Sequence, residues 1–388
     1  MIITVNRREL LSAVQNAEAI VPASTTLEAM KCVYLMTERN KITLSAGSME
    51  LALEQGLPAV VQEDGSAALN AKMFSKALTL MEGTDVTVSQ ESNTVNVIAR
   101  DTVYTFSGVD TALFTRPAIP APELSISVSG LCTIAKGTVF AASRERTLCL
   151  DIKHCVRLQY DSQGSQAVCT DGVILAFVKG GEKSSVPMDL LLPASSLEKL
   201  ARMISDRDTL ELGIEQNMAV FRKQNFSFAA RLVSGTYPDV DKLVASIGSK
   251  YRVLTDAEAL RKAVGVVSTV LDKKSSFSLE FEHHRITLSC EGAYGTSLEI
   301  LETVALSGTP SGKYWYDPRK LSTCLKALKG TLTLEVGGNG VLLLRTENQL
   351  CMLMAMREPK RQAEEPKPRE KKSAKSKKKE EAAQSEAA

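Results

Sequence analysis

The chain carries the same pattern of elements three times, and this repeat limits its fold more than any single motif does. A short strand pattern that runs into a helix pattern begins near residues 1, 125 and 250, so the copies start about 125 residues apart. A second unit, made of a strand end, a short amphipathic helix and a hairpin, also occurs three times. Asn70, Pro193 and Asp317 stand just before its helix, at intervals of 123 and 124 residues.

The second unit changes its period from 3.6 to 2 near Gly83, Asp206 or Gly330, which indicates a helix followed by hairpin strands. The stretches "ESN", "EQN" and "GGNG" supply turn residues for these hairpins. We therefore expect an α+β fold of three similar domains, each with two helices packed on antiparallel sheets. The expected bounds are 1–122, 123–248 and 249–358.

Length and composition agree with a multidomain folded protein. The 388 residues exceed the size at which one hydrophobic core keeps growing, and the chain is 44% hydrophobic and 24% charged. It has no run of 18 uncharged apolar residues, and its N-terminus "MIITVNRREL" lacks the long apolar segment of a signal peptide. We expect a cytoplasmic protein that has no membrane partner.

Nothing in the sequence indicates catalysis, a metal site or a cofactor. The eight cysteines contain no C-x-x-C pair and are expected to be small buried side chains. His283 and His284 fall in a strand pattern, where neighbours point to opposite faces and cannot easily share a metal. Asp171, in the stretch "TDG", has no evident acid or base partner. No Ser-His-Asp set, Cys-His set or phosphate-binding loop is present, so we expect a protein that is not an enzyme.

The C-terminal residues 359–388 form a charged tail that contains ten Lys or Arg and almost nothing apolar. Such a segment cannot bury enough surface to offset the entropy lost on ordering, so we expect it to be disordered. It serves either as a solubilising tail or as a weak tether to nucleic acid or a membrane surface.

Positive charge is concentrated in the predicted helices. Six helical segments hold fourteen basic and six acidic residues, whereas the rest of the chain is net negative. If the copies stack with their helices on one side, those helices form a positive wall suited to phosphates. No zinc-finger, helix-turn-helix or aromatic RNA-binding pattern accompanies the charge, so the expected binding to a duplex is independent of sequence. The helical segments are 7–19, 71–82, 130–144, 195–205, 256–268 and 318–329.

Four stretches, taken in order, resemble the bacterial DNA polymerase III beta subunit, the beta sliding clamp. "TDGVILA" (170–176) is similar to the family's T-D-G-H-R-L-A, and "RLVSGTYPDVDKLV" (231–244) is similar to its L-V-x-G-x-F-P-D-Y. "LLPASSLEKLARMI" (191–204) and "MLMAMR" (352–357) are similar to further family stretches, the second to its closing V-x-M-P-M-R. The resemblance covers residues 1–358.

The resemblance implies a head-to-tail homodimer in which each chain forms half of a ring around double-stranded DNA. It also implies that the DNA polymerase III alpha subunit and the clamp-loader subunits dock by short linear motifs between domains 2 and 3. Position by position, it carries a peptide groove over to this chain. The implied groove residues are Thr170, Gly172, Val173, Ile174, Leu175, Ala245, Asp317, Lys320, Met352, Met354, Ala355, Met356 and Arg357.

The apolar stretch "LCMLMAMR" (350–357) fits this groove. The equivalent strands of the first two copies still alternate with polar residues, whereas this one is apolar on both faces. We expect one face to join the core and the other to form the groove floor, where methionines repack around different peptides. The alternative is a strand that is buried on both faces.

The sequence departs from the family pattern at several sites. Val173 and Ile174 replace His-Arg, and Ala355 and Ala245 replace prolines, so we expect a groove that prefers more apolar peptides. Ser24 and the pair Ala194-Ser195 replace basic residues on the DNA side. These losses leave open a peptide-docking scaffold that no longer encircles DNA.

The remaining candidates lie on the DNA and dimer surfaces. The expected dimer contact joins Tyr104 and Phe106 to Val270 and Leu271. The expected DNA-binding residues are Lys72, Lys76, Lys136, Lys199, Arg202, Arg261, Lys262, Lys326 and Lys329.

Overall fold

The computed structural model describes residues 1–358 apart from 110, 112–115, 146, 148–149, 273–274 and 311. Residues 1–356 form one compact unit, and the C-terminal segment from residue 357 onward is a separate one. The predicted tail, 359–388, lies outside the described residues. None of the described helices is long and apolar enough to span a bilayer.

The first copy contains two helices and nine strands among the described residues. Their bounds are β1 Ile2–Asn6, α1 Arg7–Ile20, the 3-10 turn η1 Glu28–Lys31, β2 Cys32–Glu38, β3 Lys41–Gly47, β4 Leu51–Pro58, β5 Val60–Glu63, β6 Ser66–Asn70, α2 Ala71–Leu80, β7 Asp85–Glu91, β8 Thr94–Ala99 and β9 Thr102–Ser107.

The second copy repeats this order without a counterpart of β5, and a third helix, α5, follows it. The bounds are β10 Ser125–Val128, α3 Leu131–Thr138, η3 Val139–Ala141, η4 Ile152–His154, β11 Cys155–Tyr160, β12 Ser165–Thr170, β13 Ile174–Gly180, β14 Met188–Pro193, α4 Ala194–Met203, β15 Leu210–Glu215, β16 Met218–Lys223, β17 Phe226–Arg231 and α5 Val240–Ile247.

The third copy again has two helices and nine strands in the described part of the chain. They are β18 Ser249–Asp256, α6 Ala257–Val267, η5 Ser268–Val270, β19 Ser276–Glu282, β20 Arg285–Gly292, β21 Gly295–Glu302, β22 Val304–Gly308, β23 Gly312–Trp315, α7 Pro318–Ala327, β24 Thr331–Gly337, β25 Leu342–Arg345 and β26 Gln349–Leu353. The predicted α+β class and all six predicted helices are confirmed.

The helices begin where the sequence supplies caps. The Asn70 side chain accepts a hydrogen bond from the Met73 backbone N–H (3.1 Å) at the start of α2, and Asp317 caps α7 in the same way. Pro193 occupies the equivalent place before α4 but makes no side-chain cap. The helix expected over 130–144 is shorter, because α3 ends at Thr138 and the chain tightens into η3.

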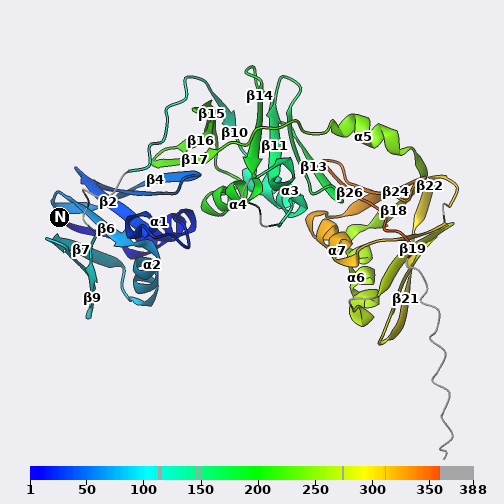
Figure 1. Cartoon of the computed structure of the whole chain (residues 1–388), viewed down its shortest axis with the longest axis horizontal. Helices are drawn as coiled ribbons and strands as arrows, with labels where there is room; N and C mark the ends of the chain where they lie inside the picture. Colours follow the sequence, from blue (N-terminus) through cyan, green and yellow to red (C-terminus); the bar gives the residue numbers. More distant parts are fainter. Residues whose placement is uncertain are drawn as a thin grey trace, which may run out of the picture. The chain divides into compact units, whose positions relative to one another are not determined.

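Strand pairing joins each copy to the next (Figure 1). β17 of the second copy pairs with β4 of the first and completes an eight-stranded sheet. β26 of the third copy pairs with β13 of the second and completes a nine-stranded sheet. Because adjacent copies share a backbone ladder, both junctions are held by main-chain hydrogen bonds as well as by side chains.

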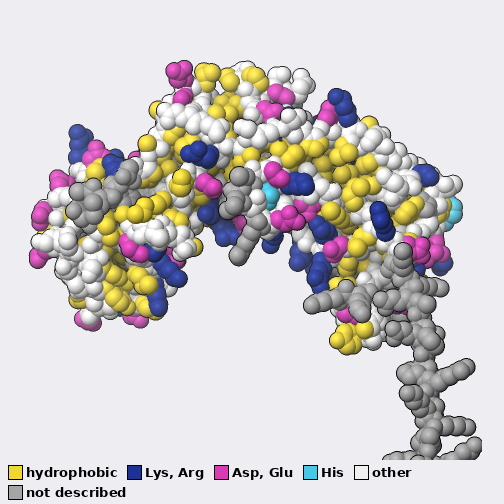
Figure 2. Space-filling model, viewed as in Figure 1, with side chains coloured by type: hydrophobic (Ala, Val, Ile, Leu, Met, Phe, Trp, Pro, Cys, Tyr) yellow, Lys and Arg dark blue, Asp and Glu magenta, His cyan; other side chains and the backbone are white. Residues whose placement is uncertain are grey.

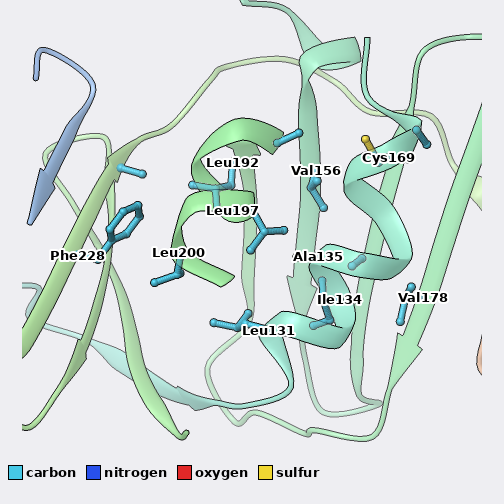
Figure 3. Close-up of a cluster of buried hydrophobic side chains, with 14 of the residues drawn as sticks. Leu131, Ile134, Ala135, Val156, Cys169, Val178, Leu192, Leu197, Leu200 and Phe228 are labelled. Carbon is cyan, nitrogen blue, oxygen red and sulfur yellow. The ribbon is translucent and has the colours of Figure 1, made fainter. Parts of the chain in front are cut away.

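The main core lies between the helices and these sheets. In the second copy, Leu131 and Ile134 of α3 and Leu197 and Leu200 of α4 belong to one cluster of buried side chains between the helices and the strands (Figure 3). α1 packs on α2, and α6 on α7, in the same way. Each helix pair therefore covers one face of its sheets, and the opposite faces of its helices are left for solvent or a ligand.

Candidate docking groove, DNA surface and edge strands

β26 is buried on both faces. Cys351 and Leu353 join the main core, whereas Leu350 and Met352 belong to a second apolar cluster on the other face of the sheet. The second cluster also contains Leu175, and side chains of α5 pack against it. Met352 and Leu175, which the resemblance implies for the groove, are 6% and 1% exposed on this face, so neither side chain is accessible in this structure. The strand is buried on both faces as far as Leu353.

The accessible apolar side chains follow the end of β26. Met354 is 38% exposed, Met356 is 55% exposed, and Ala355 between them is half-buried. Ile174 pairs with Leu353 in the sheet, so the next residue on each side brings Val173, which is 39% exposed, beside Met354. Residues 354–356, called the methionine segment below, thus form an apolar surface with Val173.

Two backbone hydrogen bonds fix the methionine segment. The Met354 N–H donates to the Val173 carbonyl (3.0 Å), which belongs to the second copy. The Met356 N–H donates to the Trp315 carbonyl (2.7 Å) on β23 of the third copy. The segment belongs to the third copy but is hydrogen-bonded to both copies, so its position depends on both.

The turn between β12 and β13 is stabilised by its own side chains. The Thr170 hydroxyl donates to the Ile174 carbonyl (2.6 Å) and accepts from the Gly172 N–H (3.0 Å). Gly172 has φ +89°, a value that residues with a Cβ rarely adopt, and no atom lies near the space that a side chain would fill. Ile174 is buried in the core, so among the predicted groove residues of this turn only Gly172 and Val173 are exposed.

Asp171 has a partner that the sequence did not reveal. Its Oδ2 accepts a hydrogen bond from Lys320 Nζ at 2.5 Å, and its Oδ1 accepts the backbone N–H groups of Val173 (2.8 Å) and Ile174 (2.7 Å). Burial alone would raise the pKa of Asp171, but these hydrogen bonds and the Lys320 ammonium together hold it below its ordinary value of 3.8. Asp317 caps α7 through the Arg319 and Lys320 N–H groups, so its carboxylate is also engaged.

Ala245, another residue implied for the groove, lies on a different element from this surface. Ala245 is on α5, the helix that the sequence analysis missed, although Asp239 at its start and Gly248 at its end are ordinary cap signals. It lines a mainly polar cleft of about 420 Å³ with Arg252, Glu335 and other residues, none of which was predicted for the groove. Arg357 is exposed and is the first residue after the compact unit.

The predicted DNA-binding residues differ in how free their charges are. In Figure 2, Lys and Arg side chains gather where Figure 1 places α2, α4 and α7. Arg202 pairs with Glu198 (2.6 Å), whereas Arg261 and Lys262 share Glu258. Lys199 is half-buried, and burial lowers its pKa although the Glu50 carboxylate opposes this. Five lysines are exposed and have no ion pair within the described part of the chain: Lys72, Lys76, Lys136, Lys326 and Lys329.

Two of these lysines meet at the junction of copies 2 and 3. Lys136 of α3 and Lys329, just after α7, line one cleft of about 800 Å³ together with Lys179. Asp206 and Glu347 also line it, but both oxygens of Asp206 accept hydrogen bonds from Thr133. The cleft can therefore hold phosphate oxygens near several cations.

The predicted dimer residues lie at two strand edges. Tyr104 and Phe106 are on β9, an edge strand of the five-stranded sheet, and their stacked rings pack against the core. Val270 and Leu271 are half-buried at η5, which packs against β20 and β21. β21 is itself an edge strand of the four-stranded sheet.

The histidine and cysteine expectations have different outcomes. His284 has φ +62° and forms a hairpin turn with His283 between β19 and β20, so the prediction that both lie within a strand is wrong. Seven cysteines are free and buried, as predicted, and Cys149 lies outside the described residues. Among the residues that the structure describes, no group of three or more His, Cys, Asp or Glu side chains could hold a metal ion.

Two family models match successive parts of the chain. The N-terminal domain of the DNA polymerase III beta subunit matches residues 1–123, and the central domain of the same subunit matches residues 125–239. Together these matches cover more than half of the chain. A protein named beta sliding clamp from Synechococcus elongatus is 24% identical in an alignment 339 residues long, which covers 84% of this chain and 89% of that protein.

Solved structures share the fold. A putative DNA polymerase III beta subunit from Eubacterium rectale superposes with a TM-score of 0.84 at 18% identity and covers 92% of this chain and 100% of its own. A sliding clamp from Pseudomonas aeruginosa, solved bound to griselimycin, superposes with a TM-score of 0.83 at 18% identity and the same coverage. At this identity the structures establish the fold alone.

Proposed function

The chain belongs to the DNA polymerase III beta subunit family, and from this membership we propose that it is a sliding clamp, a non-enzymatic processivity factor that encircles duplex DNA. In this proposal two chains close head to tail into a ring in the cytoplasm. The DNA polymerase III alpha subunit and clamp-loader subunits dock by short linear motifs between domains 2 and 3. The proposed domains are 1–122, 123–248 and 249–358, followed by the tail 359–388.

One observation carries the ring closure: β9 and β21 are edge strands that pair on one side only, whereas their counterparts in the other copies pair at both internal junctions. In those junctions the last strand of one copy, β17 or β26, pairs with β4 or β13 of the copy before it. β9 is the last strand of the first copy, and β21 holds the place of β4 and β13 in the third. Within one chain these two strands lie in the first and third copies and do not pair with each other. The free edge of β9 in one chain can instead pair with the free edge of β21 in a second chain.

The internal junctions also suggest the register of this contact. The second residue of β17, Ser227, pairs with the fourth residue of β4, Glu54. The second residue of β26 likewise pairs with the fourth residue of β13. Copied to β9 and β21, this rule places Val103 opposite Leu298. Both side chains are apolar and exposed, at 58% and 61%, as expected of surfaces that a partner covers.

The experiment that tests this proposal is the mass of the purified protein in solution. One chain has a mass of 42.0 kDa, so a closed ring of two chains sediments at about twice that mass at micromolar concentration. A single-chain mass at all concentrations would contradict ring closure. It would favour the alternative of a docking scaffold that does not encircle DNA.

For the partner groove, we propose the exposed surface made by Val173 and the methionine segment, with Gly172 and Ala355 at its border. Its support is the concentration of exposed apolar side chains at the junction of copies 2 and 3. Flexible methionines suit several different peptides. We further propose that griselimycin, which is bound to the Pseudomonas aeruginosa clamp, binds this surface as well.

For the DNA surface, we propose the exposed lysines of α2, α3 and α7 and the residues that follow α7. A duplex held by its phosphates needs local positive potential and no base contacts, so it can slide. Arg202, Arg261 and Lys262 contribute less in this proposal, because each already has a carboxylate partner. The ion pairs must open before these side chains reach a phosphate.

A further inference from the structure

The methionine segment is attached at two points that belong to different copies. Its first attachment is the Val173 carbonyl in the turn between β12 and β13, and its second is the Trp315 carbonyl on β23. Trp315 is followed closely by α7, whose first turn carries Lys320. The ion pair between Lys320 and Asp171 therefore joins the turn that carries the first attachment to the helix that follows the second.

The geometry of this pair leaves little freedom to either side chain. Asp171 uses one carboxylate oxygen for the backbone of its own turn and the other for the ammonium of Lys320. The two side chains are only 18% and 31% exposed, so solvent and salt screen the pair less than a surface pair. In the free protein the Lys320 ammonium is committed to Asp171 and does not present a free charge to a peptide.

We propose that the Asp171–Lys320 pair is a latch that positions the docking groove. By fixing the turn of copy 2 against α7 of copy 3, it sets the separation of Val173 and Trp315, and through them the course of the methionine segment. Lys320 is then a positioning residue, whereas the family resemblance had implied that it belongs to the peptide groove itself. This inference rests on the groove proposed above.

Three substitutions separate these two roles of Lys320. Asp171→Asn keeps an oxygen for the N–H groups of Val173 and Ile174 but removes the negative charge. Lys320→Met keeps the length of the side chain and removes the positive charge, and Lys320→Arg keeps that charge. Thermal unfolding of each variant establishes that it is folded before it is compared.

Griselimycin affinity is the first measurement. A latch predicts that Asp171→Asn and Lys320→Met each weaken binding by about five- to tenfold, a typical effect for a partly buried charged hydrogen bond. The double variant should bind no worse than either single one, because both remove the same interaction. Lys320→Arg should stay close to the wild type. Weakening by Lys320→Met alone, with Asp171→Asn unchanged, would show a direct contact and overturn the latch.

Hydrogen exchange of the ligand-free protein is the second measurement. If the latch holds the segment, the Met354 and Met356 amides exchange about five- to tenfold faster in both charge-removing variants than in the wild type. Unchanged exchange in both variants would overturn the latch, whatever the affinities show. A wild type that does not bind griselimycin would count against the proposed groove, and the exchange rates would then decide the latch by themselves.

Discussion

Met352 and Met354 are two residues apart, so an extended strand would place both side chains on the same face, yet only Met354 is accessible to a partner. Met352 is 6% exposed beneath the second apolar cluster, whereas Met354 lies past the last sheet residue. The sequence identified this stretch as unusual because it is apolar on both faces. It could not show where the strand ends, since Met, Ala and Met continue the pattern without a break.

Substitution of the two exposed methionines tests the groove at this scale. Met354→Ala and Met356→Ala should each weaken griselimycin binding by about 1 kcal/mol, the cost of removing an apolar anchor, and together raise the Kd about tenfold or more. Calorimetric titration measures the effect. Met49→Ala is the matched control, because Met49 is 81% exposed in the turn between β3 and β4, the first copy's counterpart of the turn that carries Val173. Equal losses in the control and the double variant would contradict the placement.

We expect the contribution of the Asp171 carboxylate to stability to depend on pH in the acid range. Its pKa lies below its ordinary value of 3.8 in the folded protein, so its contribution to stability is fully present above that value. The contribution is lost as the pH falls through the lower, folded pKa. The difference in unfolding free energy between the wild type and Asp171→Asn should therefore be constant from pH 7 to pH 5 and shrink below about 4. A difference that grew on acidification would have the wrong sign.

At this scale, the contacts that could not be predicted join residues far apart in the sequence. Asp171 and Lys320 are 149 positions apart, and no periodicity relates them. The "TDG" stretch showed a carboxylate in a turn, but its partner became visible only once copies 2 and 3 were joined by β13 and β26. The prediction that His283 and His284 lie within a strand was wrong for a local reason. A two-residue turn between two alternating strands preserves the alternation of apolar and polar residues, so the turn does not interrupt the pattern.

At the scale of elements, the helices were predictable because their caps and periodicity are local. Asn70 and Asp317 each stand at the predicted start, and both make the cap. α5 was overlooked although Asp239 caps it, because it lies in a connector that has no counterpart among the repeated units. Strand partners were less accessible to prediction, since β17 and β26 pair with strands of another copy.

The edge strands provide the test at this scale. Val103→Lys or Leu298→Lys should convert the dimer to a monomer at micromolar concentration, because an ammonium would be buried opposite an apolar side chain. Sedimentation measures the mass. Leu306→Lys is the control, since Leu306 is equally an exposed apolar residue of an edge strand, β22, but lies outside the proposed contact. Dissociation by all three variants alike, or by none, would contradict the proposed pairing of β9 with β21.

At the scale of the whole molecule, the sequence predicted where the positive charge is concentrated. It did not predict which of these cations are free of a carboxylate partner. The helices do carry the excess of positive charge. Which cations are free depends on neighbours one helical turn away, and Glu198 and Glu258 engage three of the nine predicted residues. Ring closure was implied by resemblance alone, whereas the two free strand edges supply a physical reason for it.

Salt dependence tests the proposed DNA surface. Lys136→Ala with Lys329→Ala should reduce the slope of log K against log salt concentration by about two, since each lost phosphate contact removes about 0.9. Fluorescence anisotropy with a short duplex at several salt concentrations measures the slope. Lys41→Ala with Lys223→Ala is the matched control, because these lysines lie outside the helices and pair with Glu38 and Asp208. A slope equal to that of the wild type would remove the cleft from the DNA surface.

The most direct test of the central claim is topological. Val103→Cys and Leu298→Cys, placed in one chain, are joined between chains by a short bis-maleimide after the protein has been assembled on a nicked circular duplex. The seven described native cysteines are buried and should react slowly. We predict that the cross-linked protein stays on the circle at about 1 M salt, where ionic contacts are screened within about 3 Å, and leaves when a nuclease linearises the DNA. Equal retention on circular and linear DNA, or release from both, would contradict a clamp that encircles its duplex.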